Sequence, residues 1–214
     1  LTFTYSIQVE DHSPDGSLFD NSTITVTIIG TNDVPVITTG VVTGAIVEGS
    51  GALSSSGSIS FIDQDLSNTA VITTTNSSIT WSGGTLSSSQ IENLYAGLSV
   101  TPTSYGTQTN PISSRTVSWT YSRSESDLNF LREGETLTIV QYIRVTDSPS
   151  GAYQATPITI TITGTNDTPV ITNGSDTAAL TETNSTITAT DTNTLTDIDI
   201  TQKHTSNHKK INKA

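Results

Sequence analysis

The chain has 214 residues, contains neither Cys nor Met, and carries a formal net charge of −12. Without Cys it can form neither a disulfide framework nor a thiolate metal site, and its acidic balance makes nucleic acid a poor partner, because phosphate binding needs a basic face. No apolar run approaches the roughly 18 residues of a membrane span, so we expect no membrane insertion.

The charges are unevenly distributed along the chain. All 20 acidic residues lie between Glu10 and Asp199, whereas the lysines begin at Lys203. An acidic body attracts cations, although acidity also keeps many secreted proteins soluble. The sequence does not begin with Met, so we expect it to be a piece of a longer protein.

Alternation of apolar and polar residues predicts strands from the first residues onward. Apolar side chains occupy every second position over 3–9 and 24–28, and again over 158–162. The pattern also covers 137–145, where Gln141 interrupts the apolar face. Such runs predict strands with one face on a core and one in water, and short strands between turn residues favour an all-β sandwich.

Helical signals are weak and short. The stretches SSSQIENLYAG (87–97) and SESDLNFLREG (124–134) each place Ser before acidic or amide residues and Gly at the end. These are start and stop signals of helices, but neither stretch is long enough to form a stable helix alone. We expect a short turn of helix in each.

An eleven-residue stretch occurs twice with small changes. IIGTNDVPVIT spans residues 28–38, and ITGTNDTPVIT spans residues 162–172, 134 positions later. The same offset aligns Asp65 with Asp199 without a gap, as expected of a tandem array. We therefore predict the last two strands of one repeat at 1–33, a complete repeat at 34–167, the opening strands of a third at 168–200, and a disordered basic tail at 201–214.

Two longer motifs accompany the two GTNDxPVIT stretches. They are VEGSGALSSSGSISFIDQD (47–65) and VSWTYSRSESDLNFLREGETLTIVQYIRVTDSPSG (117–151). Together these stretches resemble the VCBS repeats of giant bacterial surface proteins, which are cadherin-like modules of RTX-type adhesins. The resemblance covers about 200 residues, and the complete repeat is longer than expected of the family, with the excess around 76–114. It implies an immunoglobulin- or cadherin-like β-sandwich, type I export to the medium or the bacterial cell surface, and calcium between repeats.

The resemblance also implies which residues would hold Ca²⁺, an ion that takes oxygen ligands. Cadherin-like junctions supply these oxygens from a Glu, an Asn–Asp linker and a D-x-D with a later Asp. The first junction would use Asn32, Asp33, Asp63, Asp65 and Asp147. The second would use Glu48, Asn166, Asp167, Asp197 and Asp199, with Glu133 or Glu135 by loose analogy, and Asp11 would serve a junction upstream. Because a divalent ion removes the repulsion between clustered carboxylates, such sites would stiffen the chain into a rod.

Each of these residues also has a simpler interpretation. Asp and Asn close turns through their own side chains, so the D-x-D of Asp63 and Asp65, the hairpin residue Asp147 and the Asn–Asp pairs are also expected of ordinary loops. The recurrence of Glu, D-x-D and Asn–Asp at one spacing favours ligands, because turn chemistry alone would accept Asn, Ser or Gly.

The sequence thus predicts an extender segment of a large adhesin, monomeric, with neighbouring repeats of the same chain as partners and surface glycans bound through other domains. The alternative is a carbohydrate- or receptor-binding module using 76–114, where Trp81, Tyr95 and Tyr105 lie among small polar residues. We expect no enzyme. His12, the one histidine of the acidic body, lies in DHSPDG, which is typical of a hairpin loop.

Overall fold

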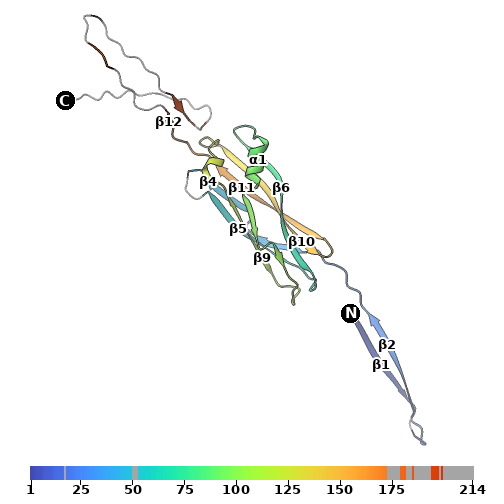
Figure 1. Ribbon diagram of the computed structural model, residues 1–214. Coiled ribbons are helices and arrows are strands. Elements are labelled where there is room, and N and C mark those ends of the chain that lie inside the picture. The colour runs from blue at the N-terminus through green and yellow to red at the C-terminus, as the bar shows by residue number, and fades with distance from the viewer. Residues whose placement is uncertain are drawn as a thin grey trace, which may run out of the picture.

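The computed structural model describes residues 1–16, 18–49, 53–172, 179–181, 185, 194–197 and 199. A central β-sandwich has a hairpin beyond one end and a short strand pair beyond the other (Figure 1). The hairpin consists of β1 (Thr2–Glu10) and β2 (Phe19–Thr27), and the strand pair of β12 (Val170–Ile171) and β13 (Leu195–Thr196). The predicted disordered tail, 201–214, lies outside the described residues, as does most of 173–193.

The sandwich consists of two sheets. One contains, in spatial order, β3 (Val36–Gly40), β5 (Ser54–Ile62), β9 (Arg115–Ser122) and β7 (Leu98–Thr101). The other contains β4 (Thr43–Val47), β11 (Tyr153–Thr163), β10 (Thr136–Ser148), β6 (Thr69–Trp81) and β8 (Ser104–Tyr105). Only β4 pairs in parallel, with β11, among the strands that the structure describes. This is the strand order of the immunoglobulin fold, so the predicted fold class is confirmed.

The core lies between the two sheets and follows the predicted alternation. Phe61, Trp119 and Tyr121 project from one sheet, and Ile143 and Ile160 from the other, all at most 2% exposed. The Trp119 indole N–H donates to the Val41 carbonyl oxygen at 2.7 Å, so the polar edge of the largest core side chain is satisfied.

The stretch 76–114 is part of the sandwich rather than an addition to it. It contains the end of β6, β7, β8 and the helix α1 (Ser88–Tyr95), and a 3-10 turn, η1 (Glu125–Asp127), follows farther along the chain. Both short helical turns were predicted. At α1, Ser87 and Gln90 form a capping box in which each side chain satisfies the other's backbone N–H, and at η1 the Asp127 carboxylate accepts the Ser124 backbone N–H.

Hydrogen bonds account for Gln141, the polar residue on the apolar face of β10. Its side chain is 4% exposed, and its Nε2 donates to Asn76 Oδ1 and to the Tyr95 carbonyl oxygen, both at 3.0 Å. Tyr95 ends α1, so this buried amide joins the helix to the sheet. A polar residue is tolerated there because its donors find partners.

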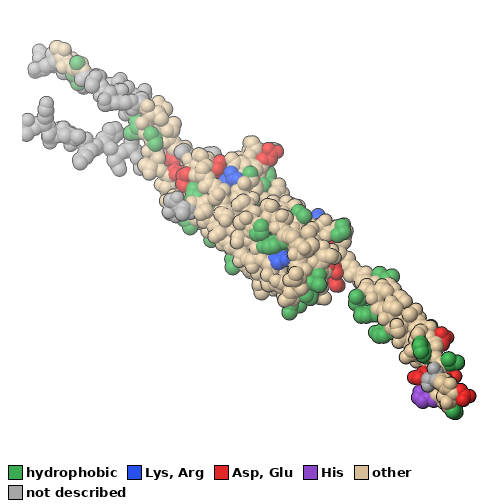
Figure 2. Space-filling model, turned by 60° about the horizontal axis from the view of Figure 1, so that its bottom comes forward, with side chains coloured by type: hydrophobic (Ala, Val, Ile, Leu, Met, Phe, Trp, Pro, Cys, Tyr) green, Lys and Arg blue, Asp and Glu red, His purple; other side chains and the backbone are tan. Residues whose placement is uncertain are grey.

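The hairpin β1–β2 departs from the prediction of half-buried strands. All of its strand residues are exposed, including the apolar Phe3 at 40%, Ile7 at 41% and Val26 at 43%. Figure 2 shows apolar side chains, in green, spread along the hairpin. The alternation is present, but no second sheet covers this face among the residues that the structure describes.

The described part of the chain contains no helix that is both long and apolar enough to cross a membrane.

Candidate metal centre

The first junction comprises the linker 28–35, residues 63–68 and the β10–β11 turn. Asp63 and Asp65 follow β5, and Asp147 lies at the end of β10, so strand ends bring the acids to one edge of the sandwich. The linker contacts them directly. Asn32 Nδ2 donates to Asp147 Oδ2 at 2.7 Å, and the Asp33 backbone N–H donates to Asp65 Oδ2 at 2.7 Å. All five residues predicted for this junction therefore lie at the same end of the sandwich.

Asn68 is a member of the first junction that sequence reasoning missed. It is 7% exposed, and its Nδ2 lies 2.8 Å from Asn32 Oδ1 and 3.4 Å from both Asp65 Oδ2 and Asp147 Oδ2. Three oxygens thus converge on one amide nitrogen. The signal available in the sequence was its position three residues after the D-x-D, which alone does not distinguish it from a loop residue.

The acids of the first junction are crowded and withdrawn from water. Asp63 is 2% and Asp147 1% exposed. Burial raises the pKa of Asp63, and the carboxylates of Asp147 and Asp65 raise it further. A cavity of about 270 Å³ opens beside them, lined by linker residues 30–32 together with Asp65, Ser67 and Asn68.

The second junction comprises the linker 164–169, Glu48 directly after β4, and the D-x-D residues Asp197 and Asp199. Thr165 donates its backbone N–H to Glu48 Oε2 at 3.1 Å, which fixes the linker to β4. The Asp167 backbone N–H donates to Asp199 Oδ2 at 2.8 Å. Asn166 donates from Nδ2 to the Asp167 carbonyl oxygen at 2.9 Å. The linker therefore contacts both the complete sandwich and the D-x-D beyond it.

Glu48 is the most perturbed acid of the second junction. It is 1% exposed, and burial raises its pKa to about 7, with Asp167, Glu125 and Asp199 adding to the effect and the bond from Thr165 opposing it. Its Oε1 is buried without a hydrogen-bond partner, and so is Asp167 Oδ2. Burial also raises the pKa of Asp167, as do Asp199, Glu125 and Asp197. Two unsatisfied carboxylate oxygens in one acidic cluster suit a hard cation.

Glu125 is the residue missed at the second junction. It belongs to η1, and its Oε1 accepts the Gly49 backbone N–H at 3.0 Å, which places it beside Glu48. The loose analogy had pointed to Glu133 or Glu135 instead. Glu135 accepts from the Trp81 indole at 3.0 Å and pairs with Arg132 at 3.2 Å, so this carboxylate is engaged elsewhere.

The two junctions repeat the same hydrogen bonds 134 residues apart. In each, the linker Asp donates its N–H to the second Asp of the D-x-D, and its carbonyl oxygen accepts from the preceding Asn. In each, the second Asp donates its N–H to the first, at 3.0 Å. The strands agree too, because Val36 pairs with Ile62 as Val170 pairs with Thr196.

The D-x-D bonds are those of Asx turns, so the turn interpretation of these residues describes part of their role. It does not account for the contacts between linker and acid across the junction. The described residues contain no group of three or more His, Cys, Asp or Glu side chains already in metal-ligand geometry. The oxygens are gathered, and a cation would have to draw them closer.

Gly164 is the first residue of the second linker, and it is required there for packing rather than for freedom of the backbone. It is buried, and a Cβ at this position would lie 2.4 Å from the Arg132 carbonyl oxygen. No atom lies within 4 Å of the equivalent point at Gly30. A side chain would therefore be excluded at the second junction by a close backbone approach.

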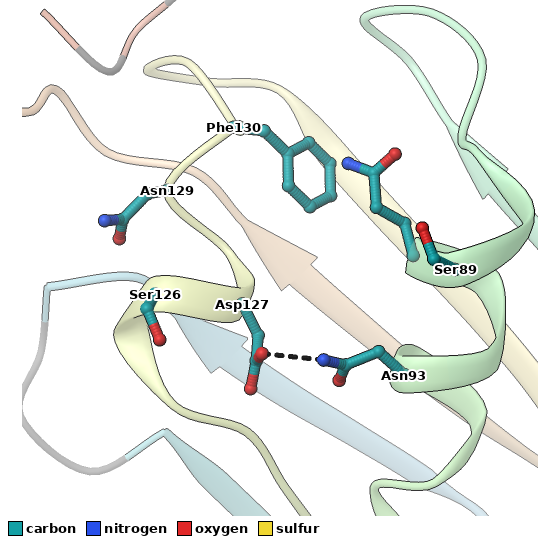
Figure 3. Close-up of a pocket in the computed structure, with 7 residues that line it drawn as sticks. Ser89, Asn93, Ser126, Asp127, Asn129 and Phe130 are labelled. Atoms are coloured by element: carbon teal, nitrogen blue, oxygen red, sulfur yellow. Dashed lines mark hydrogen bonds between the residues drawn. The ribbon is translucent and has the colours of Figure 1, made fainter.

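The remaining predicted features have distinct surroundings. His12 lies in the exposed loop between β1 and β2, as expected of a hairpin loop. Trp81, Tyr95 and Tyr105 are half-buried and pack against the core instead of forming an exposed cluster. A cavity of about 460 Å³ lies between α1 and the segment 126–130 (Figure 3), and none of these three aromatic residues lines it.

Comparison with known proteins leaves the family open. No family model matches the chain, and no curated protein matches it. Among solved structures, the periplasmic chaperone SfaE is similar at 11% identity and a TM-score of 0.34, over 61% of this chain and 56% of that chain, so the match spans just over half of the chaperone's length.

Two other similar structures are covered almost completely. The PapD-like domain 7 of human CEP192 is similar at 8% identity and a TM-score of 0.37, over 65% of this chain and 92% of that chain. AggA, the major subunit of aggregative adherence fimbriae type I from Escherichia coli, is similar at 10% identity and a TM-score of 0.33, over 64% and 99%. Identities and scores this low support no argument about function.

Proposed function

We propose that this chain is a segment of a rod of tandem VCBS-like β-sandwich repeats, and that Ca²⁺ at the junctions fixes each repeat to the next. The rod is a structural spacer within a large adhesin, which is exported by type I secretion and is either held at the bacterial cell surface or released into the medium. Its role is structural and not catalytic, and its partners are the neighbouring repeats. The observation that carries the proposal is the recurrence of one set of junction hydrogen bonds 134 residues apart.

The donor sets at both junctions support an oxygen-seeking cation. Asn32, Asp33, Asp63, Asp65 and Asp147 would hold it at the first junction. Glu48, Asn166, Asp167, Asp197 and Asp199 would hold it at the second, and the structure adds Glu125 beside Glu48. Calcium accepts carboxylate, amide and backbone oxygens in flexible geometry, which fits a site assembled from a linker and two domains.

The physical effect of such an ion would be on the linker. Without it, burial raises the pKa of Glu48, Asp63 and Asp167, and repulsion from neighbouring carboxylates raises each pKa further. A divalent ion favours their ionised forms and ties the linker to both neighbouring domains. The chain would then be pliable at low calcium and stiff at the millimolar calcium of extracellular media, without any disulfide.

Thermal unfolding with calcium and with a chelator tests the proposal. For a Kd of about 10⁻⁴–10⁻³ M, about 10 mM Ca²⁺ adds about 1.4–2.7 kcal/mol per site, which raises the Tm by about 5–10 °C. We expect Asp63→Asn/Asp65→Asn to remove about half of the rise, and further addition of Glu48→Gln to remove the rest.

The matched control is Asp15→Asn/Asp20→Asn, which makes the same charge change on the exposed hairpin. It should leave the calcium response intact. No calcium response in the unaltered chain, or an equal loss in the control, would refute calcium at the junctions and leave these acids as turn residues.

A further inference from the structure

The cavity between α1 and η1 is lined by none of the residues proposed to hold calcium, although η1 also contains Glu125 of the second junction. Its volume is about 460 Å³, within the usual range of small-molecule sites. Six of the seven residues that line it carry hydroxyl, amide or carboxylate groups, and the seventh is Phe130. Figure 3 shows Ser89 and Asn93 on the helix facing Ser126, Asp127 and Phe130 on the neighbouring segment.

The floor of this pocket is fixed by a small network. Asn93 Nδ2 donates to Asp127 Oδ1 at 2.8 Å, and Arg123 donates from Nη1 to Asn93 Oδ1 at 2.8 Å. Asp127 also accepts from the Ser124 backbone N–H at 3.1 Å and hydroxyl at 2.6 Å. Because both amide atoms and the carboxylate are held, these groups are oriented before any ligand arrives.

Other polar groups around the pocket retain unused hydrogen-bonding capacity. Asn129 is among the residues that line the pocket, although its Oδ1 is itself buried without a partner. The side-chain carbonyl oxygen of Gln90 accepts the Ser87 N–H at 2.9 Å in the cap of α1. Its amide NH₂ remains available as a donor. The Ser89 and Ser126 hydroxyls each contact only a neighbouring capping serine, at 3.1 and 3.0 Å.

The aromatic wall is also positioned by its neighbour. The Phe130 ring packs edge-to-face against Trp81, with centroids 5.0 Å apart and planes at 83°, and Trp81 packs on the core. The ring is half-buried and borders the pocket. A flat apolar ring beside fixed donors and acceptors suits a ligand with an apolar face and polar edges.

The charge of the pocket narrows the class of ligand further. Asp127 is the acid among the residues that line the pocket, and its carboxylate accepts hydrogen bonds from Ser124 and Asn93. Arg123 is paired with Asp127 at 3.8 Å and offers no free positive charge. Anionic ligands are therefore disfavoured.

From these contacts we propose that the pocket binds a neutral saccharide ring, with the sugar C–H face on Phe130 and its hydroxyls on Asp127, Asn129 and Gln90. Mixed donors and acceptors around an aromatic ring match the alternating polar and apolar surface of such a ring. The proposal does not depend on calcium or on the rod, and it places saccharide recognition on the repeat itself.

NMR titration of the ¹⁵N-labelled chain with D-glucose, D-galactose, D-mannose and N-acetyl-D-glucosamine tests this proposal. We expect at least one sugar to shift the side-chain amide signals of Gln90, Asn93 and Asn129, with saturation at a Kd on the order of 1–10 mM. D-Glucuronate should bind more weakly than D-glucose because of Asp127.

Two variants and one control locate the effect. Phe130→Leu keeps the apolar volume but removes the flat ring, and Asn129→Ala removes a side-chain amide from the pocket lining; each should weaken binding about tenfold with little change in Tm. Asn21→Ala, on the exposed hairpin, should change nothing. The proposal is wrong if none of the four sugars shifts these signals, if the shifts persist in both pocket variants, or if glucuronate binds better than glucose.

Discussion

The two long hairpins of this chain, β1–β2 and β10–β11, have the same pairing and opposite surroundings. Ile7 lies opposite Ser22 as Ile143 lies opposite Thr156, so the registers agree along their length. Ile7 is nevertheless 41% exposed, whereas Ile143 is fully buried. The difference is that β10 lies beneath the sheet β3-β5-β9-β7. Alternation thus determines which side chains share a face, and only an opposing sheet determines whether that face is buried.

The ends of the two hairpins differ in the same way. Asp147, at the end of β10, accepts from Asn32 of the linker at 2.7 Å and is 1% exposed. Asp11, at the end of β1, is exposed and accepts the Leu18 backbone N–H at 2.9 Å within its own loop. Equivalent aspartates thus have different roles. Asp11 only closes its own loop, whereas Asp147 also contacts a linker, because a linker lies beside it.

The largest expected effect is on stability, when the equivalent isoleucines of the two hairpins are each replaced by alanine. Ile143→Ala should cost about 2–5 kcal/mol of unfolding free energy, because it leaves a cavity under a fully packed sheet. Ile7→Ala should cost less than about 1 kcal/mol in this chain, because its side chain is already partly in water. Urea unfolding monitored by tryptophan fluorescence measures the cost in the sandwich, where Trp81 and Trp119 lie, and amide hydrogen exchange of β1–β2 measures the cost in the hairpin. Equal costs would show that the β1–β2 face is covered in solution.

The fold was predictable because its determinants are local. The strand alternation, the capping serines of α1 and η1, and the repeat offset are all visible in the sequence, and each has its counterpart in the structure. The exposure of β1 and β2 was not predictable, because burial depends on strands elsewhere in space. The purpose of Gln141 was also hidden, since its partners Asn76 and Tyr95 are distant in sequence.

A second prediction concerns Glu48, a buried acid beside the later hairpin that has no described counterpart beside the earlier one. The chain leaving β11 passes the buried acid Glu48, whereas the described residues place no counterpart of β4 beside β2. Burial raises the pKa of Glu48 from its ordinary 4.5 to about 7 in the folded protein. Between pH 4.5 and pH 7, the folded state therefore binds more protons than the unfolded state. In chelator, stability should therefore fall as pH rises from about 4.5 to about 7.

Glu48→Gln should remove that part of the pH dependence and raise stability at pH 8 in chelator by about 1–3 kcal/mol, because a neutral amide replaces a buried charge. Glu92→Gln, an exposed change on α1, is the matched control and should have little effect. Tm measurements across pH for the three proteins separate these outcomes. Unchanged stability of Glu48→Gln at pH 8 would contradict a charged Glu48 under strain from its neighbours.

The candidate site was predictable as a set of residue types and only partly as a set of contacts. Every predicted ligand of the first junction lies at that junction, because the D-x-D follows one strand and Asp147 ends another. Asn68 and Glu125 were missed because nothing in their local sequence marks them; a fold brings them there. The orientation of each oxygen depends on linker geometry, which repeat spacing does not specify.

The smallest expected effect comes from a substitution that gives the later hairpin the residue found at the equivalent position of the earlier one. The Arg144 guanidinium lies 3.5 Å from the centroid of the Tyr153 ring, on the outer face of β10 and β11. The corresponding residues of the first hairpin are Gln8 and Phe19, which cannot form this cation–π contact. Arg144→Gln should therefore cost about 0.5–1 kcal/mol, the value of an exposed cation–π pair.

A double-mutant cycle with Tyr153→Leu measures the coupling, because each single variant removes the same contact. Arg144 also donates to Thr146 Oγ1 at 3.1 Å, so Arg144→Lys separates the charge from that hydrogen bond. A coupling energy near zero would mean that the outer face of β10–β11 contributes no more than the exposed surface of β1–β2. The difference in stability between the two hairpins would then come from the buried face alone.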